Sequence, residues 1–243
     1  MEAEVILVCL FASLLAGFVH GALGMGYGMI TMATVTLVAP YNNAAAIVAV
    51  ALLVLVSQVS WQLRKYIDWR GALLPSLALL AGKISGIVLM MHLQSVYLRI
   101  AFGVFLIAYS STQLMNVKAL KIKGTPWQAL FFCGMGGLFG GVFNVSGPFA
   151  SIYCQAKYGH DPKAYAANMN LYFVPSALVA IFMHIGYGNF NPSAVVGSGI
   201  MAASVLLSAT LGVAVLKRLK AKKMYLLSNI YIIIMGTIIC IGG

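Results

Sequence analysis

Two stretches, GFVHGALGMGYG at 17–28 and GMGGLFGGVFNVSG at 134–147, place clusters of glycine inside segments that are otherwise as apolar as a membrane span. Glycine costs roughly 1 kcal/mol relative to alanine in a helix interior, so such clusters mark places where a helix breaks or where two backbones touch. In lipid, a broken helix is tolerated only where protein or a water-filled cavity covers its unpaired peptide groups. Two such breaks, half a chain apart, indicate a transporter.

The composition is that of an integral membrane protein. Hydrophobic residues make up 62% of the chain and charged residues 8%, against roughly 45–50% and 25% in soluble domains. Apolar segments of about 20 residues, enough to cross a bilayer, fall at 44–62, 71–91, 97–116, 165–186, 193–216 and 224–242. Two further segments, 5–38 and 126–156, carry the glycine clusters and are too long for one upright crossing.

The net charge of +11 could indicate nucleic-acid binding, but the basic residues are scattered among short loops between apolar segments. Such loops orient a membrane protein, because Lys and Arg are enriched on the cytoplasmic side. We therefore expect no nucleic-acid partner. The N-terminus lacks the basic region of a cleaved signal, since Arg64 is the first basic residue. The four cysteines show no CxxC spacing, so we expect neither a metal nor a cofactor.

The positions of the basic residues predict the topology. If all eight segments crossed, the basic loops would be split between the two faces, against the usual cytoplasmic excess. If 126–156 instead forms a re-entrant hairpin, every Lys and Arg except Lys83 and Arg99 falls on one face. If 5–38 behaves likewise, both termini lie outside. Whether this first hairpin is re-entrant or crosses the membrane stays open, because no basic loop precedes Arg64.

Each half of the chain would then comprise one hairpin and three transmembrane helices. Three is odd, so the halves are inverted relative to each other, which is a recurring transporter design. Traces of a duplication support this arrangement: GALG at 21–24 aligns with GLFG at 137–140, and YIDW at 66–69 with YGNF at 187–190. The predicted division is an N-terminal repeat at 1–116, a basic cytoplasmic linker at 117–124 and a C-terminal repeat at 125–243.

Lys83 is the basic side chain well inside a predicted span. A charge at mid-membrane costs about 2.5–3.5 kcal/mol on insertion scales, so such residues usually face a cavity and mark a functional site. One interpretation is an ammonium group that attracts an anionic substrate. The alternative is a lysine that extends to the membrane surface from one turn off the midplane.

The hairpin tips are a second candidate for anion binding. Helix N-termini expose unpaired N–H groups and a partial positive charge, so a helix that restarts after a break can hold an anion without a charged side chain. The alternative is that these glycines only allow close helix packing. The predicted substrate contacts at the tips are Gly24, Gly26, Gly28, Asn144, Ser146 and Gly147.

Other polar residues within the apolar segments are candidates of lower specificity. His20 precedes the first glycine cluster and could relay protons, and His184 is a weaker candidate. Gln58 and Asn170 are further substrate-binding candidates, although buried polar groups often only bond neighbouring helices. Asn168 and Asn170 lie two residues apart, so at most one of them points into a central cavity.

Several signatures are absent from the sequence. The predicted spans contain no carboxylate, so a cation site built on intramembrane Asp or Glu is not expected, although backbone carbonyls could still hold Na⁺. There is no P-loop, HExxH or GxSxG motif. We therefore expect no ATP hydrolysis and no enzyme activity.

The chain resembles the sulfite exporter TauE/SafE family of membrane permeases. The resemblance covers nearly the whole chain and rests on GALGMGYGMITM at 21–32, GLFGGVFNVSGPFAS at 137–151 and the order of about eight apolar segments. In the family the first motif commonly continues into a proline-containing stretch, whereas 31–37 contains none. The resemblance implies transport of sulfur-containing or carboxylated organic anions across the cytoplasmic membrane. It does not extend to Lys83, which matches no family motif.

Taken together, the sequence predicts an all-α membrane protein with two inverted repeats, each a glycine-broken re-entrant hairpin plus three transmembrane helices. Its predicted function is secondary transport of small anions of the sulfite, sulfonate or carboxylate type by alternating access. A channel for an anion or neutral solute is the nearest alternative, followed by a membrane-embedded enzyme. The expected partners are the anionic substrate, membrane lipid, a coupling proton or ion, and a second copy of the chain in a homodimer.

Overall fold

The structure is a computed structural model that describes residues 3–115, 122–215 and 221–242. Within these ranges all regular secondary structure is helical, which confirms the predicted all-α class. Six of the described helices are long and apolar enough to cross a membrane. They are α1 (Ala3–Leu23), α3 (Tyr41–Gln62), α4 (Trp69–His92), α5 (Ser95–Leu114), α8 (Pro162–Gly186) and α9 (Pro192–Val215).

Two of the expected segments differ from these six helices. The predicted span at 224–242 corresponds to α10 (Ala221–Gly242), whose described apolar part, Ser228–Ile241, is shorter than the six. Segment 5–38 is predicted as one hairpin, but its first helix, α1, is by itself long and apolar enough to cross a membrane. The linker at 117–124 and the basic run that begins at Lys217 lie partly outside the described residues.

Two helices break inside the predicted glycine-rich stretches. α1 ends at Leu23 and α2 (Tyr27–Val35) follows after three residues. α6 (Pro126–Phe143) is likewise followed, after three residues, by α7 (Gly147–Tyr158). Both breaks use the left-handed backbone region: φ is 78° at Gly24, 112° at Gly26 and 56° at Asn144. Glycine reaches this region without steric cost, and asparagine is one of the few other residues that tolerate it.

One end of the molecule, here called the basic end, gathers six described basic residues: Arg64, Lys65, Arg70, Lys123, Lys157 and Lys163. There the chain passes through a short 3-10 helix, η1 (Arg64–Tyr66), before α4 begins. Asp68 caps α4 by accepting a hydrogen bond from the Gly71 N–H, and Asp161 caps α8 by accepting one from the Lys163 N–H. Such caps satisfy N–H groups that have no partner inside the helix.

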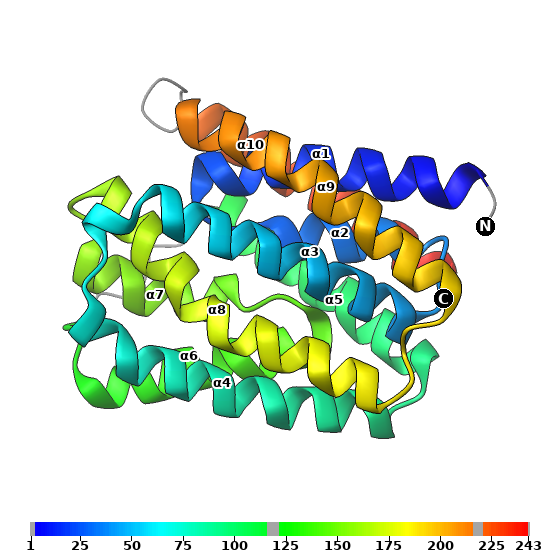
Figure 1. Ribbon diagram of the computed structural model, residues 1–243, viewed down its shortest axis with the longest axis horizontal. Coiled ribbons are helices and arrows are strands. Elements are labelled where there is room, and N and C mark those ends of the chain that lie inside the picture. Colours follow the sequence, from blue (N-terminus) through cyan, green and yellow to red (C-terminus); the bar gives the residue numbers. More distant parts are fainter. Residues whose placement is uncertain (1–2, 116–121, 216–220, 243) are drawn as a thin grey trace.

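Each broken pair of helices begins and ends at the same end of the molecule (Figure 1). Val5, near the start of α1, lines the same surface hollow as Val38 and Pro40, which follow α2; this hollow lies opposite the basic end. Gly124, just before α6, lies beside Lys157, near the end of α7, at the basic end. The two pairs therefore enter the bundle from opposite ends.

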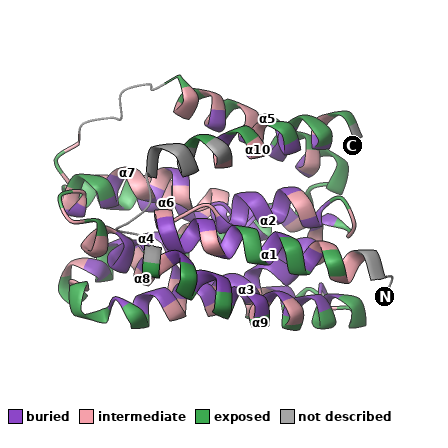
Figure 2. Ribbon diagram, turned by 90° about the horizontal axis from the view of Figure 1, so that it is seen from above, coloured by how far each residue is buried: buried purple, intermediate pink, exposed green. Residues whose placement is uncertain are grey.

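The helix packing has matching partners in the two halves (Figure 2). α4 packs closely on α6, and α9 packs closely on α1. Glycines allow both approaches: Gly86 of α4 faces Gly141 of α6, and Gly212 of α9 faces Gly21 of α1. Small residues at such contacts let helix backbones touch, which replaces the hydrophobic effect as a source of packing in lipid.

The helix ends pair the two glycine-rich stretches differently from the identities in the sequence. GALG at 21–24 aligns with GLFG at 137–140 by identity, which pairs Gly24 with Gly140. The helix ends instead pair Leu23 with Phe143, and the left-handed residue Gly24 with Asn144. The two pairings differ by about one helical turn, because glycines recur every few residues in both segments.

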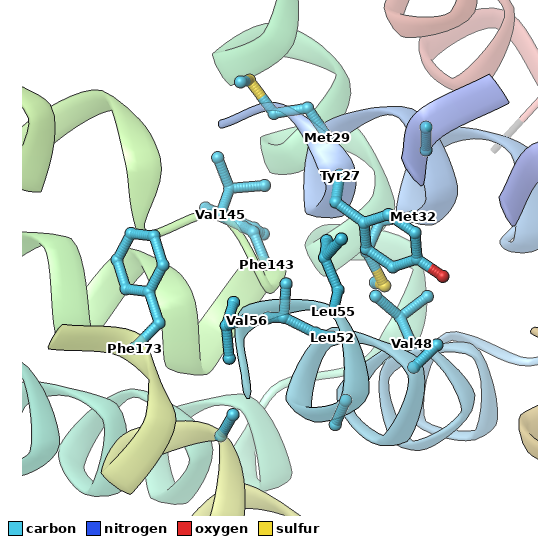
Figure 3. Packing of buried hydrophobic residues seen from close by; sticks show 14 of the residues in the cluster. Tyr27, Met29, Met32, Val48, Leu52, Leu55, Val56, Phe143, Val145 and Phe173 are labelled. Atoms are coloured by element: carbon cyan, nitrogen blue, oxygen red, sulfur yellow. The ribbon is translucent and has the colours of Figure 1, made fainter. Parts of the chain in front are cut away.

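The core lies around the two breaks. Side chains of α2, α3, α8 and the end of α6 pack together there, and Figure 3 shows Tyr27, Leu52, Phe143 and Phe173 among them. The Tyr27 hydroxyl forms a hydrogen bond with the Ser13 Oγ, which fixes the start of α2 against α1. This packing holds two interrupted backbones next to each other in the middle of the molecule.

Candidate functional site

The two helix breaks meet at the centre of the bundle. A methyl group added to Gly28, in the first turn of α2, would overlap the carbonyl oxygen of Asn144 in the other break. One added to Gly147 would lie 3.4 Å from the Met25 Cβ. Between them lies a cavity of about 30 Å³. It is lined by His20, Met25, Gly26, Tyr27, Gly28, Met29, Leu52, Lys83, Asn144, Val145, Ser146, Gly147, Phe173, Ser176 and Ala177.

Lys83 reaches this cavity from α4 with a side chain that is only 2% exposed. Its Nζ donates hydrogen bonds to the Gly140 carbonyl at 2.5 Å and to the Asn144 Oδ1 at 2.9 Å. The Gly140 carbonyl belongs to the last turn of α6, where the helix carries a partial negative charge. The ammonium group is thus anchored at a helix C-terminus within the protein, and the two bonds use two of its three N–H donors.

Asn144 connects the break after α6 to three other elements. Its Oδ1 accepts from Lys83 of α4, and its Nδ2 donates to the Ala45 carbonyl of α3 at 2.8 Å. The same nitrogen lies 3.7 Å from the Met32 Sδ of α2. Because the side chain is 4% exposed and its bonds are made within the protein, it fixes the shape of this break.

Both restarting helices present their N-termini to the cavity. Tyr27, Gly28 and Met29 of α2 line it, as do Ser146 and Gly147 at the start of α7. The Ser146 side chain makes no capping hydrogen bond and Gly26 has no side chain, so of the N–H groups at these two helix starts only that of Tyr27 is bonded to a side chain among the described contacts, to the His20 Nδ1. An uncapped helix start keeps N–H groups and a partial positive charge available to an anion.

His20 lines the cavity from the last turn of α1. Its Nε2 lies 2.9 Å from the Asn170 Oδ1, and its Nδ1 lies 3.4 Å from the Tyr27 N–H. Asn170 in turn donates to the Ala166 carbonyl one turn earlier in α8. The Tyr27 N–H can only donate, so its contact favours an acceptor at Nδ1 and a hydrogen on Nε2. Asn170 orients His20 and does not itself line the cavity.

Some predicted residues lie away from the cavity. Gln58 donates to the Leu206 carbonyl and to the Thr210 Oγ1, so it joins α3 to α9. Gly24 lies in the first break but against Tyr165 of α8. Asn168 and His184 bond at opposite ends of α8: Asn168 accepts from the Asp68 N–H, and His184 pairs with Asn189.

Four cavity residues lie outside both glycine-carrying segments, 5–38 and 126–156, and are not among the predicted residues: Leu52 of α3, and Phe173, Ser176 and Ala177 of α8. In sequence they are ordinary members of apolar helices. Only the packing of α3 and α8 against the breaks brings them to the cavity. Pro175, which lies within α8 beside Ser176, is the one local signal of irregular backbone in this stretch.

A cluster of polar contacts joins the two halves at the basic end. Asp68 accepts a hydrogen bond from the Tyr158 hydroxyl at 2.8 Å and lies 3.6 Å from the Lys157 Nζ. Lys163 donates to the Tyr66 hydroxyl at 2.9 Å. The Gly71 N–H, the Tyr158 hydroxyl and Lys157 all favour the ionised carboxyl, so they lower the pKa of Asp68 below its usual value.

Within the described residues, no three His, Cys, Asp or Glu side chains are grouped as a metal site. Comparison with protein families matches residues 9–239 to the sulfite exporter TauE/SafE family. Comparison with curated proteins and with solved structures gives no match.

Proposed function

Because the chain belongs to the TauE/SafE family of sulfite exporters, whose members are membrane transporters and not enzymes, we propose that it moves small organic or sulfur-containing anions by alternating access. The observation that carries this proposal is the central cavity between the two helix breaks. Two uncapped helix N-termini and the Lys83 ammonium line it. All three favour negative charge.

The substrate would contact the restarting helices near Gly28, Ser146 and Gly147, with Lys83 as the charged ligand. Asn144 would position Lys83 through its 2.9 Å hydrogen bond. Gly24, Gln58 and Asn170 keep supporting roles: Gly24 shapes the first break, Gln58 joins two helices, and Asn170 orients His20. His20 is the proposed proton-coupling residue, since it lies at the same cavity and an imidazole ring can both accept and donate a proton.

We propose that the two halves are inverted repeats and that each broken pair is a re-entrant hairpin. Three observations support this: the pairs enter from opposite ends, α4–α6 packing matches α9–α1 packing, and Gly24 corresponds to Asn144. Transporters of this design bind substrate between discontinuous helices at mid-membrane and move one part against the other. A homodimer remains part of the proposal.

We propose that the basic end faces the cytoplasm, because cytoplasmic loops of membrane proteins carry an excess of Lys and Arg. All three tryptophans, Trp61, Trp69 and Trp127, are exposed and lie at helix ends beside these basic residues. Exposed tryptophan prefers the membrane–water interface, so it supports placing the membrane boundary at this level. Both termini then face the outside of the cytoplasmic membrane.

The cavity size favours a carrier over a channel, the alternative function. About 30 Å³ is room for roughly two waters by the same measure. A sulfonate or carboxylate would fit only if the two breaks moved apart. A carrier exposes such a site to one side at a time, whereas a channel needs a continuous path.

Transport can be tested with protein reconstituted into liposomes. We expect saturable uptake of at least one of sulfite, methanesulfonate and acetate, coupled to a proton or ion gradient. Lys83→Gln should weaken it at least tenfold, and Lys65→Gln, at the exposed basic end, should not. Absence of binding and flux for all three anions would refute the function, while flux without saturation or coupling would favour the channel.

Cysteine labelling tests the topology separately. Lys123→Cys and His160→Cys flank the broken pair α6–α7, and we expect both to react from the cytoplasmic side in a background from which the native cysteines are removed. Labelling from opposite sides would defeat the re-entrant model while leaving transport itself untouched.

A further inference from the structure

The cavity also carries information about the charge of its ligand. We propose that this site selects anions with a single negative charge and a small apolar group over dianions of the same shape. The inference rests on the proposed function, because it names the substrate class of that same cavity. Its argument combines the charges around the cavity with the chemistry of its walls.

The positive charge available to a ligand is close to one elementary charge. Each helix N-terminus contributes roughly half a positive charge, and two of them, from α2 and α7, line the cavity. The C-terminal ends of α1 and α6 lie at the same two breaks and contribute about as much negative charge, so about the single charge of Lys83 remains. Its ammonium group donates to the Gly140 carbonyl in the last turn of α6 and to Asn144. One of its N–H donors is left for a ligand.

Nothing else in the described lining supplies a second positive charge. Apart from Lys83, the basic side chain at the cavity is His20, whose two ring nitrogens already contact Asn170 and Tyr27. No carboxylate lines the cavity among the described residues. A dianion would therefore keep about one uncompensated charge in a site surrounded by protein and lipid, which is strongly unfavourable.

The remaining wall suits an apolar group. Met25, Met29, Leu52, Val145, Phe173 and Ala177 face the cavity. These side chains offer neither hydrogen bonds nor charge to a second anionic oxygen, whereas they can cover a methyl or methylene group. Leu52 of α3 and Phe173 and Ala177 of α8 come from other helices than Lys83 and the helix starts, and the Ser176 hydroxyl among them already donates to the Phe173 carbonyl. A ligand with one charged and one apolar end can therefore meet both kinds of lining.

Methanesulfonate and sulfate provide a matched pair of probes, since they have nearly the same size and shape and differ by a methyl group in place of a charged oxygen. We expect purified wild-type protein at neutral pH to bind methanesulfonate at least tenfold more tightly than sulfate, with the same order in liposome uptake. Lys83→Met should lower methanesulfonate affinity at least tenfold, with Lys65→Met as the control.

Equal or tighter binding of sulfate would overturn the inference, and so would sulfite uptake without methanesulfonate binding; in both cases the transport proposal would stand. Absence of binding and flux for every anion tested would instead remove the proposed function. If Lys83→Met fails to fold, as judged by size-exclusion chromatography, the comparison of the two anions on the wild-type protein still decides the question.

Discussion

The two helix breaks meet at the centre of the molecule but are built by different means. The break after α1 uses two glycines with positive φ, Gly24 and Gly26. The break after α6 uses Asn144, which adopts the same backbone region and also bonds Lys83 and Ala45 through its side chain. The first relies on backbone freedom, and the second is cross-linked to its surroundings.

This difference suggests a division of roles. The cross-linked break carries the ammonium group of Lys83, so its geometry decides where the charge lies. Gly24 and Gly26 have no side chain to bond, so the glycine break is held from its flanks, by the Tyr27 hydroxyl on Ser13 and by a longer 3.4 Å contact between the Tyr27 N–H and His20. We infer that the second break is the more rigid wall of the cavity.

The largest effect is expected where the two breaks touch. Gly28→Ala would place a methyl group on the Asn144 carbonyl oxygen, and backbone atoms on both sides leave little room to adjust. We expect a loss of stability at the upper end of the about 1–3 kcal/mol typical of overpacking. Thermal unfolding in detergent, with monodispersity by size-exclusion chromatography, measures it.

Gly147→Ala is the matched control in α7, the helix that restarts after the second break. Its added methyl group would lie 3.4 Å from the Met25 Cβ, which is ordinary contact with a side chain. This variant should lose less than about 1 kcal/mol. Equal losses in the two variants would mean that the breaks are not in contact at Gly28.

Removing the cross-link alone, without adding backbone strain, should have a smaller effect. Asn144→Gly keeps the positive φ accessible but removes the acceptor for Lys83 and the donor to Ala45. Losing a buried hydrogen-bond partner costs about 1–3 kcal/mol, and substrate affinity should fall because Lys83 is no longer positioned. Asn144→Ala should lose about 1–2 kcal/mol more, the cost of the left-handed region for a residue with a side chain.

The comparison of Asn144→Gly with Asn144→Ala separates bonding from backbone strain. If the two variants are equally stable, strain at φ 56° is not part of the cost. If Asn144→Gly keeps wild-type affinity in the liposome assay, Asn144 does not position Lys83, and the second break is no more rigid than the first.

The breaks, the helical class and the helix positions could be predicted because their causes are local. Glycine clusters in apolar sequence mark interrupted helices, and apolar length marks spans. The cavity could be predicted in part for the same reason: Lys83, Gly28, Asn144 and Ser146 stand out as polar or flexible residues in lipid. The other cavity residues are brought there by packing between helices, which the sequence of a single helix does not reveal.

Leu52, Phe173 and Gln58 illustrate that second kind of information. Leu52 and Phe173 look like any apolar residue in a span, and only the crossing of α3 and α8 at the breaks gives them a place at the cavity. Gln58 looks functional because it is polar, yet it bonds α9. Its polarity is satisfied between helices, which the sequence of one helix does not reveal.

Exchanging the residue type between the breaks should have a mild effect. Gly24→Asn would place in the first break the residue found in the second, at a φ of 78° that asparagine tolerates. Its Cβ would lie 3.3 Å from the Tyr165 Cε1, a side-chain atom that can move slightly. Thermal unfolding should show that Gly24→Asn loses less than about 1 kcal/mol of stability. Gly24→Val should lose about 1–2 kcal/mol more than Gly24→Asn, because valine is strained in the left-handed region.

The smallest effect concerns the contacts between the halves at the basic end. The folded state lowers the pKa of Asp68, through the Gly71 N–H first and the Tyr158 hydroxyl second. A group with a lowered folded pKa stabilises the protein above its unfolded pKa, about 4 for aspartate, and this contribution is lost as pH falls through the folded pKa. Asp68→Asn should remove this contribution, so that between about pH 4 and the folded pKa of Asp68 the unfolding temperature falls less in the variant than in the wild type. The side chain is 43% exposed, so solvent screens the effect and keeps it small. If the unfolding temperature of the variant depends on pH as that of the wild type does, the Asp68 contacts do not help to hold the two halves together, and the contacts at the breaks do.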